Sequence, residues 1–175
     1  SHESTAGYRA VAVATLTGNQ SRWAGLGDRG DGQAPTNTTT FELGSITKLF
    51  TGLMLADAVD RGEVKLDDTL DMYLPALSGT LAGGVTLEEL ATHRSGLPAY
   101  ADDETGATYE GQGASDVESI SAADVVDQAA DLLLSGRGSY QYSNLGVTLL
   151  GDALASALGA PSWVWLVNER VLKPA

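Results

Sequence analysis

From residue 45 onwards the apolar residues of this chain recur every three or four positions, which is the spacing of a helix with one buried face. In the first such stretch the apolar positions are Ile46, Leu49, Phe50, Leu53, Met54 and Val59. Gly62 follows it, as glycine commonly does at a helix C-terminus. The same spacing predicts helices from Ser121 to Leu134, from Asn144 to Leu158, and from Ser162 to about Pro174. Most of the chain is therefore expected to pack as helices.

Shorter helices are predicted between these long ones. One begins at Asp67-Asp68 and is limited by Pro75. The stretch Thr86-Leu87-Glu88-Glu89 has the pattern of a capping box, which predicts that another helix starts there. This helix is expected to continue to about His93 and to stop at Gly96.

Strands are predicted only near the N-terminus. Tyr8–Thr17 is rich in β-branched residues, Gly18-Asn19 supplies a turn, and Ser21–Gly27 reads as the second arm of a hairpin. Residues 28–38 are a polar loop, and residues 97–120 are an acidic, glycine-rich loop without a helical or strand period. Loops as long as the second one often border a functional site.

One hairpin followed by helices does not make a complete fold, because a two-stranded sheet is marginally stable by itself and needs further strands or a packed face. We therefore expect two parts. Residues 1–42 would supply the N-terminal strands of an incomplete α/β subdomain, and residues 43–175 would form a mainly helical subdomain. The outer edge of the hairpin is expected to recruit other strands, from a separate C-terminal fragment or from a second copy of the chain.

The composition excludes several classes of function. The net charge is −13, with 23 acidic and 10 basic residues, so no basic patch is available to neutralise nucleic acid or an anionic membrane surface. The chain has no cysteine, which excludes disulfides and thiol catalysis. No apolar run is long enough to cross a bilayer. The sequence shows no signal peptide, although such a segment is removed from a mature secreted protein.

Two motifs are interpreted as structural. Gly25–Gly30 matches the GxGxxG pattern of dinucleotide-binding loops, but no helix is predicted after it, so we interpret it as a turn. His93 is the only histidine besides His2, which disfavours a zinc site and a Ser-His-Asp triad, and the GxSxG elbow is absent. We expect His93 to be structural, near a helix C-terminus. No metal and no cofactor are expected.

Ser45 and Lys48 form the first candidate for catalysis. Residues three positions apart lie on the same side of a helix, so the lysine amine can reach the serine hydroxyl. The unpaired N–H groups of a first helical turn can stabilise an oxyanion when that hydroxyl attacks a carbonyl. Burial favours a neutral lysine, which can act as a base. The alternative is that Ser45 only caps the helix and that Lys48 is a surface residue.

Tyr142-Ser143-Asn144, just before an apolar helix, is the second candidate. A tyrosine can shuttle a proton, and an asparagine can bind both an amide and a lysine. The alternative is a buried tyrosine followed by an asparagine helix cap. If both candidates belong to one site, the hydroxyl of Tyr142 should lie near Ser45 and Lys48.

Three stretches together resemble the serine β-lactamase and penicillin-binding-protein superfamily. They are FELGSITKLFTGLMLADAVDRGEVKLDDTLDMYLP, LEELATHRSGLP and YQYSNLGVTLLG, and their order and spacing match the branch of class C β-lactamases, D-alanyl-D-alanine carboxypeptidases and family VIII esterases. The resemblance implies the β-lactamase/transpeptidase-like fold, α/β plus all-α, in an incomplete form. It covers nearly the whole chain, which resembles the N-terminal portion of such proteins.

The resemblance also implies roles for four residues. Ser45 would be the acylated nucleophile, and its backbone N–H would form half of an oxyanion hole. Lys48 would deprotonate it. Tyr142 would relay the proton to the leaving group and activate the deacylating water. Asn144 would bind the substrate amide and orient Lys48.

One family motif is missing. A Lys/His-Thr/Ser-Gly strand motif should follow Tyr-x-Asn, and Arg94-Ser95-Gly96, which precedes Tyr142, is interpreted as part of a structural turn. That motif recognises the substrate carboxylate, so the choice between D-Ala-D-Ala peptidase or β-lactamase chemistry and carboxylesterase chemistry stays open. A truncated, non-catalytic binding module is the alternative of another class. We expect a secreted or periplasmic enzyme with small amide or ester substrates, and little activity in the isolated chain.

Overall fold

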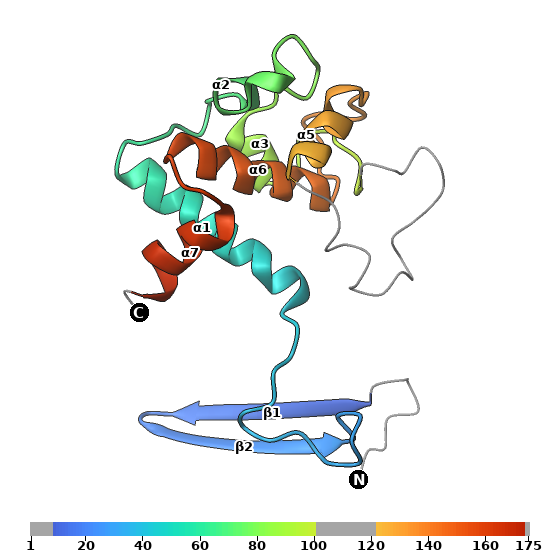
Figure 1. The fold of residues 1–175 in the computed structure, drawn as a ribbon, viewed down its shortest axis with the longest axis vertical. Coiled ribbons are helices and arrows are strands. Elements are labelled where there is room, and N and C mark those ends of the chain that lie inside the picture. The colour runs from blue at the N-terminus through green and yellow to red at the C-terminus, as the bar shows by residue number, and fades with distance from the viewer. Residues whose placement is uncertain (1–8, 101–121, 174–175) are drawn as a thin grey trace. The chain divides into compact units, whose positions relative to one another are not determined.

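The computed structural model describes residues 9–100 and 122–173. The chain forms two compact units, residues 1–44 and residues 45–175. The first contains the strands and the second contains nearly all of the helices (Figure 1).

The first unit is built on the predicted hairpin. Strands β1 (Ala10–Thr17) and β2 (Gln20–Gly27) pair antiparallel, with Ala10 opposite Gly27 and Thr17 opposite Gln20. Gly18 opens the two-residue turn with a φ of 57°, which glycine adopts without strain. The strand is therefore confirmed, although the predicted start at Tyr8 lies outside the described residues. Most of the hairpin's side chains are exposed within this unit.

The glycine-rich stretch after β2 is a loop, as predicted. The Asp28 carboxylate accepts hydrogen bonds from the N–H groups of Gly30 and Gly32, both at 2.8 Å, and so closes the turn on itself. Because no helix begins there, the stretch lacks the helix N-terminus that holds a pyrophosphate in dinucleotide-binding proteins.

The second unit begins with the long helix predicted around Lys48. Helix α1 spans Thr47–Asp60 and is preceded by one 3-10 turn, Gly44–Ile46. Gly62 ends α1 with a φ of 70°, and the N–H of Glu63 reaches back to the C=O of Ala58 at 2.9 Å. This is the Schellman arrangement, which requires a left-handed residue at the position of Gly62.

The buried face of α1 differs from the predicted one. Thr51, Met54, Leu55 and Ala58 are buried, whereas Leu49 and Leu53 are 67% and 54% exposed. Apolar residues occur on more than one side of α1. Their spacing therefore predicts an apolar helix, but it does not predict which side of the helix is buried. The side that packs is the one that contacts α6 and α7.

The remaining helices of the described residues are mostly short. They are α2 (Leu70–Tyr73), a 3-10 turn (Pro75–Leu77), α3 (Leu87–Ala91), α5 (Ala122–Ala130), α6 (Asn144–Ala157), α7 (Trp163–Val167) and a π-type turn (Asn168–Leu172).

The predicted start of α2 and the predicted end of α5 are wrong. Helix α2 does not begin at Asp67-Asp68, because the Asp68 carboxylate instead accepts the N–H of Lys65 at 2.7 Å and the hydroxyl of Tyr73 at 2.5 Å. Helix α5 ends at Ala130 rather than at Leu134. Beyond it the chain leaves the helix, and the N–H of Ser135 bonds the C=O of Gly96 at 2.8 Å.

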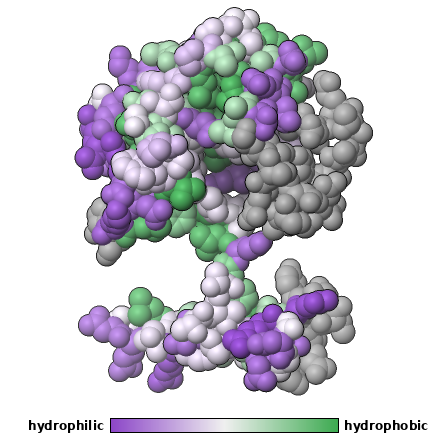
Figure 2. All heavy atoms as spheres, viewed as in Figure 1, coloured by the Kyte–Doolittle hydropathy of each residue, from purple (hydrophilic) through white to green (hydrophobic). Residues whose placement is uncertain are grey.

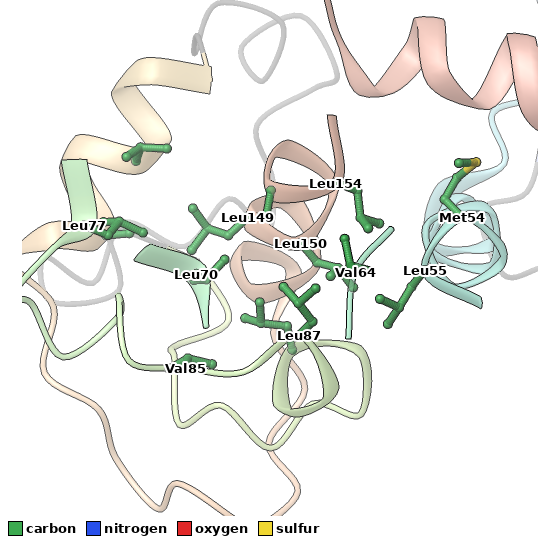
Figure 3. Close-up of a cluster of buried hydrophobic side chains, with 14 of the residues drawn as sticks. Met54, Leu55, Val64, Leu70, Leu77, Val85, Leu87, Leu149, Leu150 and Leu154 are labelled. Carbon is green, nitrogen blue, oxygen red and sulfur yellow. The ribbon is translucent and has the colours of Figure 1, made fainter. Parts of the chain in front are cut away.

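Helix α6 is at the centre of the core and contacts α1, α2, α3, α5 and α7. Figure 3 shows its leucines between the side chains of the helices around it. The fully or almost fully buried residues of this cluster include Met54, Leu55, Val64, Leu70, Leu77, Val85, Leu87, Leu149, Leu150 and Leu154. Truncating one such leucine to alanine typically costs about 2–5 kcal/mol of stability. The position of α6 is therefore strongly determined by packing.

The last described segment is held on α1 by charge. The Arg170 guanidinium bonds the Glu63 carboxylate at 2.5 and 2.9 Å and the Asp57 carboxylate at 3.2 Å. On the visible face of the helical unit, hydrophilic and hydrophobic residues are interspersed (Figure 2). Over the described residues, no helix is long and apolar enough to cross a membrane.

Candidate active site

Ser45 lies in the 3-10 turn that leads directly into α1. Gly44, immediately before it, has a φ of 53°, a left-handed conformation that glycine adopts readily. Ile46, at the N-cap position, already has helical angles, so the backbone from Ser45 into α1 is continuous helix. The prediction placed Ser45 in the first turn of the α-helix itself, and the structure places it in the 3-10 turn one step earlier. The side chain is exposed.

The amine of Lys48 links Ser45 to the start of α6. Its Nζ donates to Ser45 Oγ at 3.2 Å and to Asn144 Oδ1 at 2.5 Å. Lys48 is half-buried, so it neither extends into solvent nor inserts into the core. The helical spacing predicts the first contact. The second joins residues 96 positions apart and depends on the packing of α1 against α6.

Tyr142 reaches the same serine from the other side. Its hydroxyl lies 2.8 Å from Ser45 Oγ, and the amine of Lys48 lies 5.0 Å from the centre of its ring. The Lys48 ammonium and, after it, the hydrogen bond with Ser45 lower the pKa of Tyr142 below its usual value. A lowered pKa makes the phenolate easier to form, and a phenolate beside the serine hydroxyl can accept its proton.

Ser143, which the sequence did not single out, fixes the backbone between Tyr142 and Asn144. Its Oγ accepts the N–H of Gly146 at 2.8 Å and donates to the C=O of Pro98 at 2.6 Å, and Ser143 is buried. Ser143 is thus the N-cap of α6, and Asn144 is the first helical residue. The alternative in which Asn144 caps the helix is wrong, and its side chain is free to bond Lys48.

His93 does not lie in the last turn of α3, where it was expected. The helix ends at Ala91 and Thr92 is its C-cap, so His93 lies one residue beyond the cap. Its φ is 57°, the only positive φ among the described residues other than glycine. The N–H groups of His93 and Arg94 bond the carbonyls of Leu90 and Glu89 at 3.2 and 2.7 Å. This is a Schellman ending with histidine where glycine is usual, and the left-handed backbone costs roughly 1–2 kcal/mol.

The turn formed by residues 93–96 binds the segment before Tyr142 through backbone hydrogen bonds. The N–H groups of Ser135, Gly138 and Gln141 donate to the carbonyls of Gly96, Arg94 and His93 at 2.8, 2.8 and 2.7 Å. A Cβ on Gly96 would come within 3.0 Å of a backbone nitrogen in this segment, so the close approach requires glycine. The stretch Arg94-Ser95-Gly96 is therefore part of a structural turn, as predicted.

An ion pair adds to this contact. Arg137 bonds the Glu89 carboxylate through two nitrogens, at 2.8 and 2.7 Å, and the C=O of Gly84 at 2.7 Å. Glu89 also accepts the N–H of Thr86 in the capping box of α3. The predicted capping box is thus confirmed, and its glutamate additionally anchors the segment that leads to Tyr142.

A cavity of about 200 Å³ opens beside Lys48 and Asn144. It is lined by Thr47, Lys48, Thr51, Asn144, Val147, Thr148, Gly151 and Trp163. In the described part of the chain, no three His, Cys, Asp or Glu side chains are close enough together to hold a metal ion.

This site and fold match a known family. The family model described as Beta-lactamase matches residues 3–175, so the chain belongs to the beta-lactamase family. It is 31% identical over 182 residues to the D-alanyl-D-alanine-carboxypeptidase/endopeptidase AmpH of Escherichia coli (strain K12), with 96% of this chain and 44% of that protein covered. It is 32% identical over 163 residues to the esterase EstB of Burkholderia gladioli, with 87% of this chain and 41% of that protein covered.

A solved structure supports the fold. The class C beta lactamase from Rhodobacter sphaeroides superposes with a TM-score of 0.73 and 32% sequence identity, over 94% of this chain and 43% of that one. The incomplete β-lactamase-like fold predicted from the sequence is thereby confirmed. The chain spans less than half the length of each of these three proteins.

Proposed function

We propose that this chain carries the nucleophile and the proton-transfer residues of a serine hydrolase that works through an acyl-enzyme. The observation that carries the proposal is the position of Ser45 Oγ, which lies within hydrogen-bonding distance of both Lys48 Nζ and the Tyr142 hydroxyl, at 3.2 and 2.8 Å. A serine hydroxyl is a weak nucleophile unless an adjacent base removes its proton. Here two groups that can hold that proton meet at one oxygen.

In the acylation step, Ser45 Oγ forms a bond to the carbonyl carbon of an amide or ester. When Lys48 is a neutral amine it takes the serine proton, directly or through the phenol of Tyr142, and when Lys48 is an ammonium the Tyr142 phenolate takes it. The carbonyl oxygen becomes an oxyanion, and the backbone N–H of Ser45 is suited to stabilise it at the start of a helical segment. When the bond to the leaving amine or alcohol breaks, Tyr142 supplies the proton that this group needs.

In the deacylation step, water attacks the ester carbon of the acyl-enzyme. Tyr142, which is a phenolate after protonating the leaving group, accepts a proton from this water, and Ser45 Oγ regains a proton from Tyr142, directly or by way of Lys48, as the ester bond breaks. Asn144 is suited to two tasks, because its Oδ1 holds Lys48 while its amide nitrogen remains a donor for a substrate carbonyl. No metal ion takes part in this scheme.

Two relatives support a proposal for the substrate class. AmpH is named a carboxypeptidase and endopeptidase for D-alanyl-D-alanine, and we propose peptide or β-lactam amides of that kind as the substrates. The second candidate is a carboxylesterase reaction, which the similarity to the esterase EstB favours. A secreted or periplasmic location, which the family resemblance led us to expect, is part of the proposal.

The experiment is covalent labelling of the protein as it is encoded in its source. It is incubated with a penicillin and, separately, with a p-nitrophenyl ester, and the labelled residue is located by mass spectrometry. We expect an adduct on Ser45 that the Ser45→Ala variant lacks. Turnover of one reagent alone would distinguish lactamase or peptidase chemistry from esterase chemistry. An adduct on another serine would overturn the assignment, and binding of muropeptide without any adduct would favour a binding module.

A further inference from the structure

His93 touches the segment around Tyr142 in three ways. Its C=O accepts the N–H of Gln141 at 2.7 Å, and its Nδ1 accepts the N–H of Ser143 at 3.2 Å. Its ring lies against the ring of Tyr142, with the centres 4.6 Å apart and the planes tilted by 36°. One residue therefore holds the residue before Tyr142, the residue after it, and the phenol ring between them.

The backbone of this turn does not by itself require a histidine. A glycine would adopt the left-handed φ of 57° at position 93 without strain and would leave the Schellman hydrogen bonds in place. What the imidazole adds is the contact with Tyr142 and the acceptor for Ser143. A second ring, that of Tyr140, lies nearly perpendicular to it, with centres 5.9 Å apart and planes at 83°. The presence of histidine at this left-handed position is thus explained by the contacts of its side chain and not by the needs of the turn.

The phenol of Tyr142 needs such support, because 40% of the residue is exposed. An exposed aromatic ring has more than one accessible rotamer. The proposed proton transfer requires its oxygen at hydrogen-bonding distance from Ser45, where it lies at 2.8 Å. Misplacement by about 1 Å can reduce a rate about a hundredfold.

We propose that His93 is a positioning residue for Tyr142: the neutral imidazole fixes the backbone on both sides of the tyrosine and holds its ring against Ser45. This inference rests on the proposed function for its effect on rate, although the geometry it describes does not. Because Nδ1 accepts a hydrogen bond, the ring carries its proton on Nε2. The burial of His93 and the charge of Lys48 both lower the pKa of this histidine, which favours the neutral form.

The test compares three variants of the protein as it is encoded in its source. His93→Gly removes the ring and leaves an unstrained turn. His93→Asn tolerates the left-handed backbone and offers an oxygen to the N–H of Ser143, but has no ring. Thr92→Ala is the matched control, because Thr92 is the exposed neighbour in the same turn, and its hydroxyl bonds only the C=O of Glu88 among the described residues, at 2.8 Å.

The first readout is the rate of acylation by a penicillin or a p-nitrophenyl ester, measured with the melting temperature. We expect His93→Gly to lower the maximal rate by about 10- to 100-fold with little change in KM and in melting temperature. We expect His93→Asn to recover part of the loss and Thr92→Ala to react at the wild-type rate. An unchanged rate in His93→Gly, or a loss that follows unfolding, would overturn the inference.

The second readout does not depend on activity. The protein is labelled with fluorotyrosine, and the ¹⁹F signal that Tyr142→Phe removes is followed as the pH is raised. We expect the pKa of Tyr142 to rise in His93→Gly, because the phenol moves away from Lys48, and to stay unchanged in Thr92→Ala. If the wild-type protein is not acylated, the proposed function fails while this titration still decides the role of His93. If the pKa of Tyr142 is the same in the wild type and in all three variants, His93 does not position Tyr142.

Discussion

The amine of Lys48 lies 2.5 Å from Asn144 Oδ1, and this bond connects the first helical turn of α1 to the first residue of α6. The two residues are 96 positions apart in the chain. The amine also lies 3.2 Å from Ser45 Oγ, so Asn144 helps to determine where a lysine that contacts the proposed nucleophile is held.

Asn144→Ala is expected to slow acylation of Ser45 by roughly 10- to 100-fold. The variant removes the oxygen that holds Lys48, and general-base contributions of a positioned side chain are about 10²–10⁴-fold. Stopped-flow acylation measures the effect. Ser156→Ala is the control, because Ser156 lies on the same helix and its hydroxyl bonds the C=O of Tyr73 instead. Equal rates in both variants would show that Asn144 has no part in the site.

Lys48→Met is expected to raise the pKa of Tyr142. The hydrogen-bonding amine of Lys48 is the largest influence that holds this pKa below its usual value of 10.0, and methionine keeps the approximate length of the side chain without the donor or the charge. At a given pH below 10, less phenolate is then present in the variant. A ¹⁹F titration of fluorotyrosine-labelled protein, with the signal assigned by Tyr142→Phe, measures the change. A pKa that stays or falls would exclude Lys48 as the cause.

Asp152→Asn is expected to stabilise the 175-residue chain at pH 8 and not at pH 4. Burial raises the pKa of Asp152 to about 6 from its usual 3.8, and none of the described residues bonds its buried Oδ2. A folded-state pKa above the unfolded one means that stability is lost as the pH rises from about 4 through about 6. Above that range asparagine removes a poorly solvated charge.

The melting temperature of Asp152→Asn should therefore exceed that of the wild type by about 2–4 °C at pH 8, and the difference should disappear near pH 4. Asp127→Asn is the control, because Asp127 lines the same cavity of about 420 Å³ but is exposed. A stabilisation of equal size at both pH values would rule out the titration of Asp152 as its cause.

Two glycines in helices are expected to respond to alanine in opposite directions. A Cβ on Gly151 would lie 2.8 Å from Cδ1 of Trp163, so Gly151→Ala forces α6 and α7 apart and should lower the free energy of unfolding by about 1–3 kcal/mol. Gly52 lies within α1, and a Cβ there would meet no atom within 4 Å, so Gly52→Ala should raise it by about 0.5–1 kcal/mol. Urea unfolding of the 175-residue chain gives both values. Stabilisation by both substitutions would show that Trp163 moves aside freely.

The features that local chemistry determines could be predicted from the sequence. Gly62 ends α1, Thr86 and Glu89 start α3, and the spacing of Ser45 and Lys48 brings their side chains together. These features depend on residues within one turn of each other. They follow from backbone geometry and do not depend on the rest of the fold.

The features that depend on packing could not be predicted in this way. Leu53 was expected on the buried face of α1 and is 54% exposed, while Leu55 is buried, because the position of α6 selects the side that packs. His93 was expected to be structural, but nothing in the local sequence indicates that its ring lies against Tyr142. The stretch HRSGLP signalled a turn, and only the fold shows which segment that turn holds.

The distance in sequence between Ser45 and Tyr142 has a consequence for folding kinetics. Their hydroxyls meet across 97 positions, and contacts of such separation form only after the intervening loop has been closed. The turn at residues 93–96 and the capped start of α6 must both be in place before the phenol reaches the serine. If the proposed function holds, the serine becomes reactive only late in folding, so a substrate would not acylate a newly made chain while its core is still open.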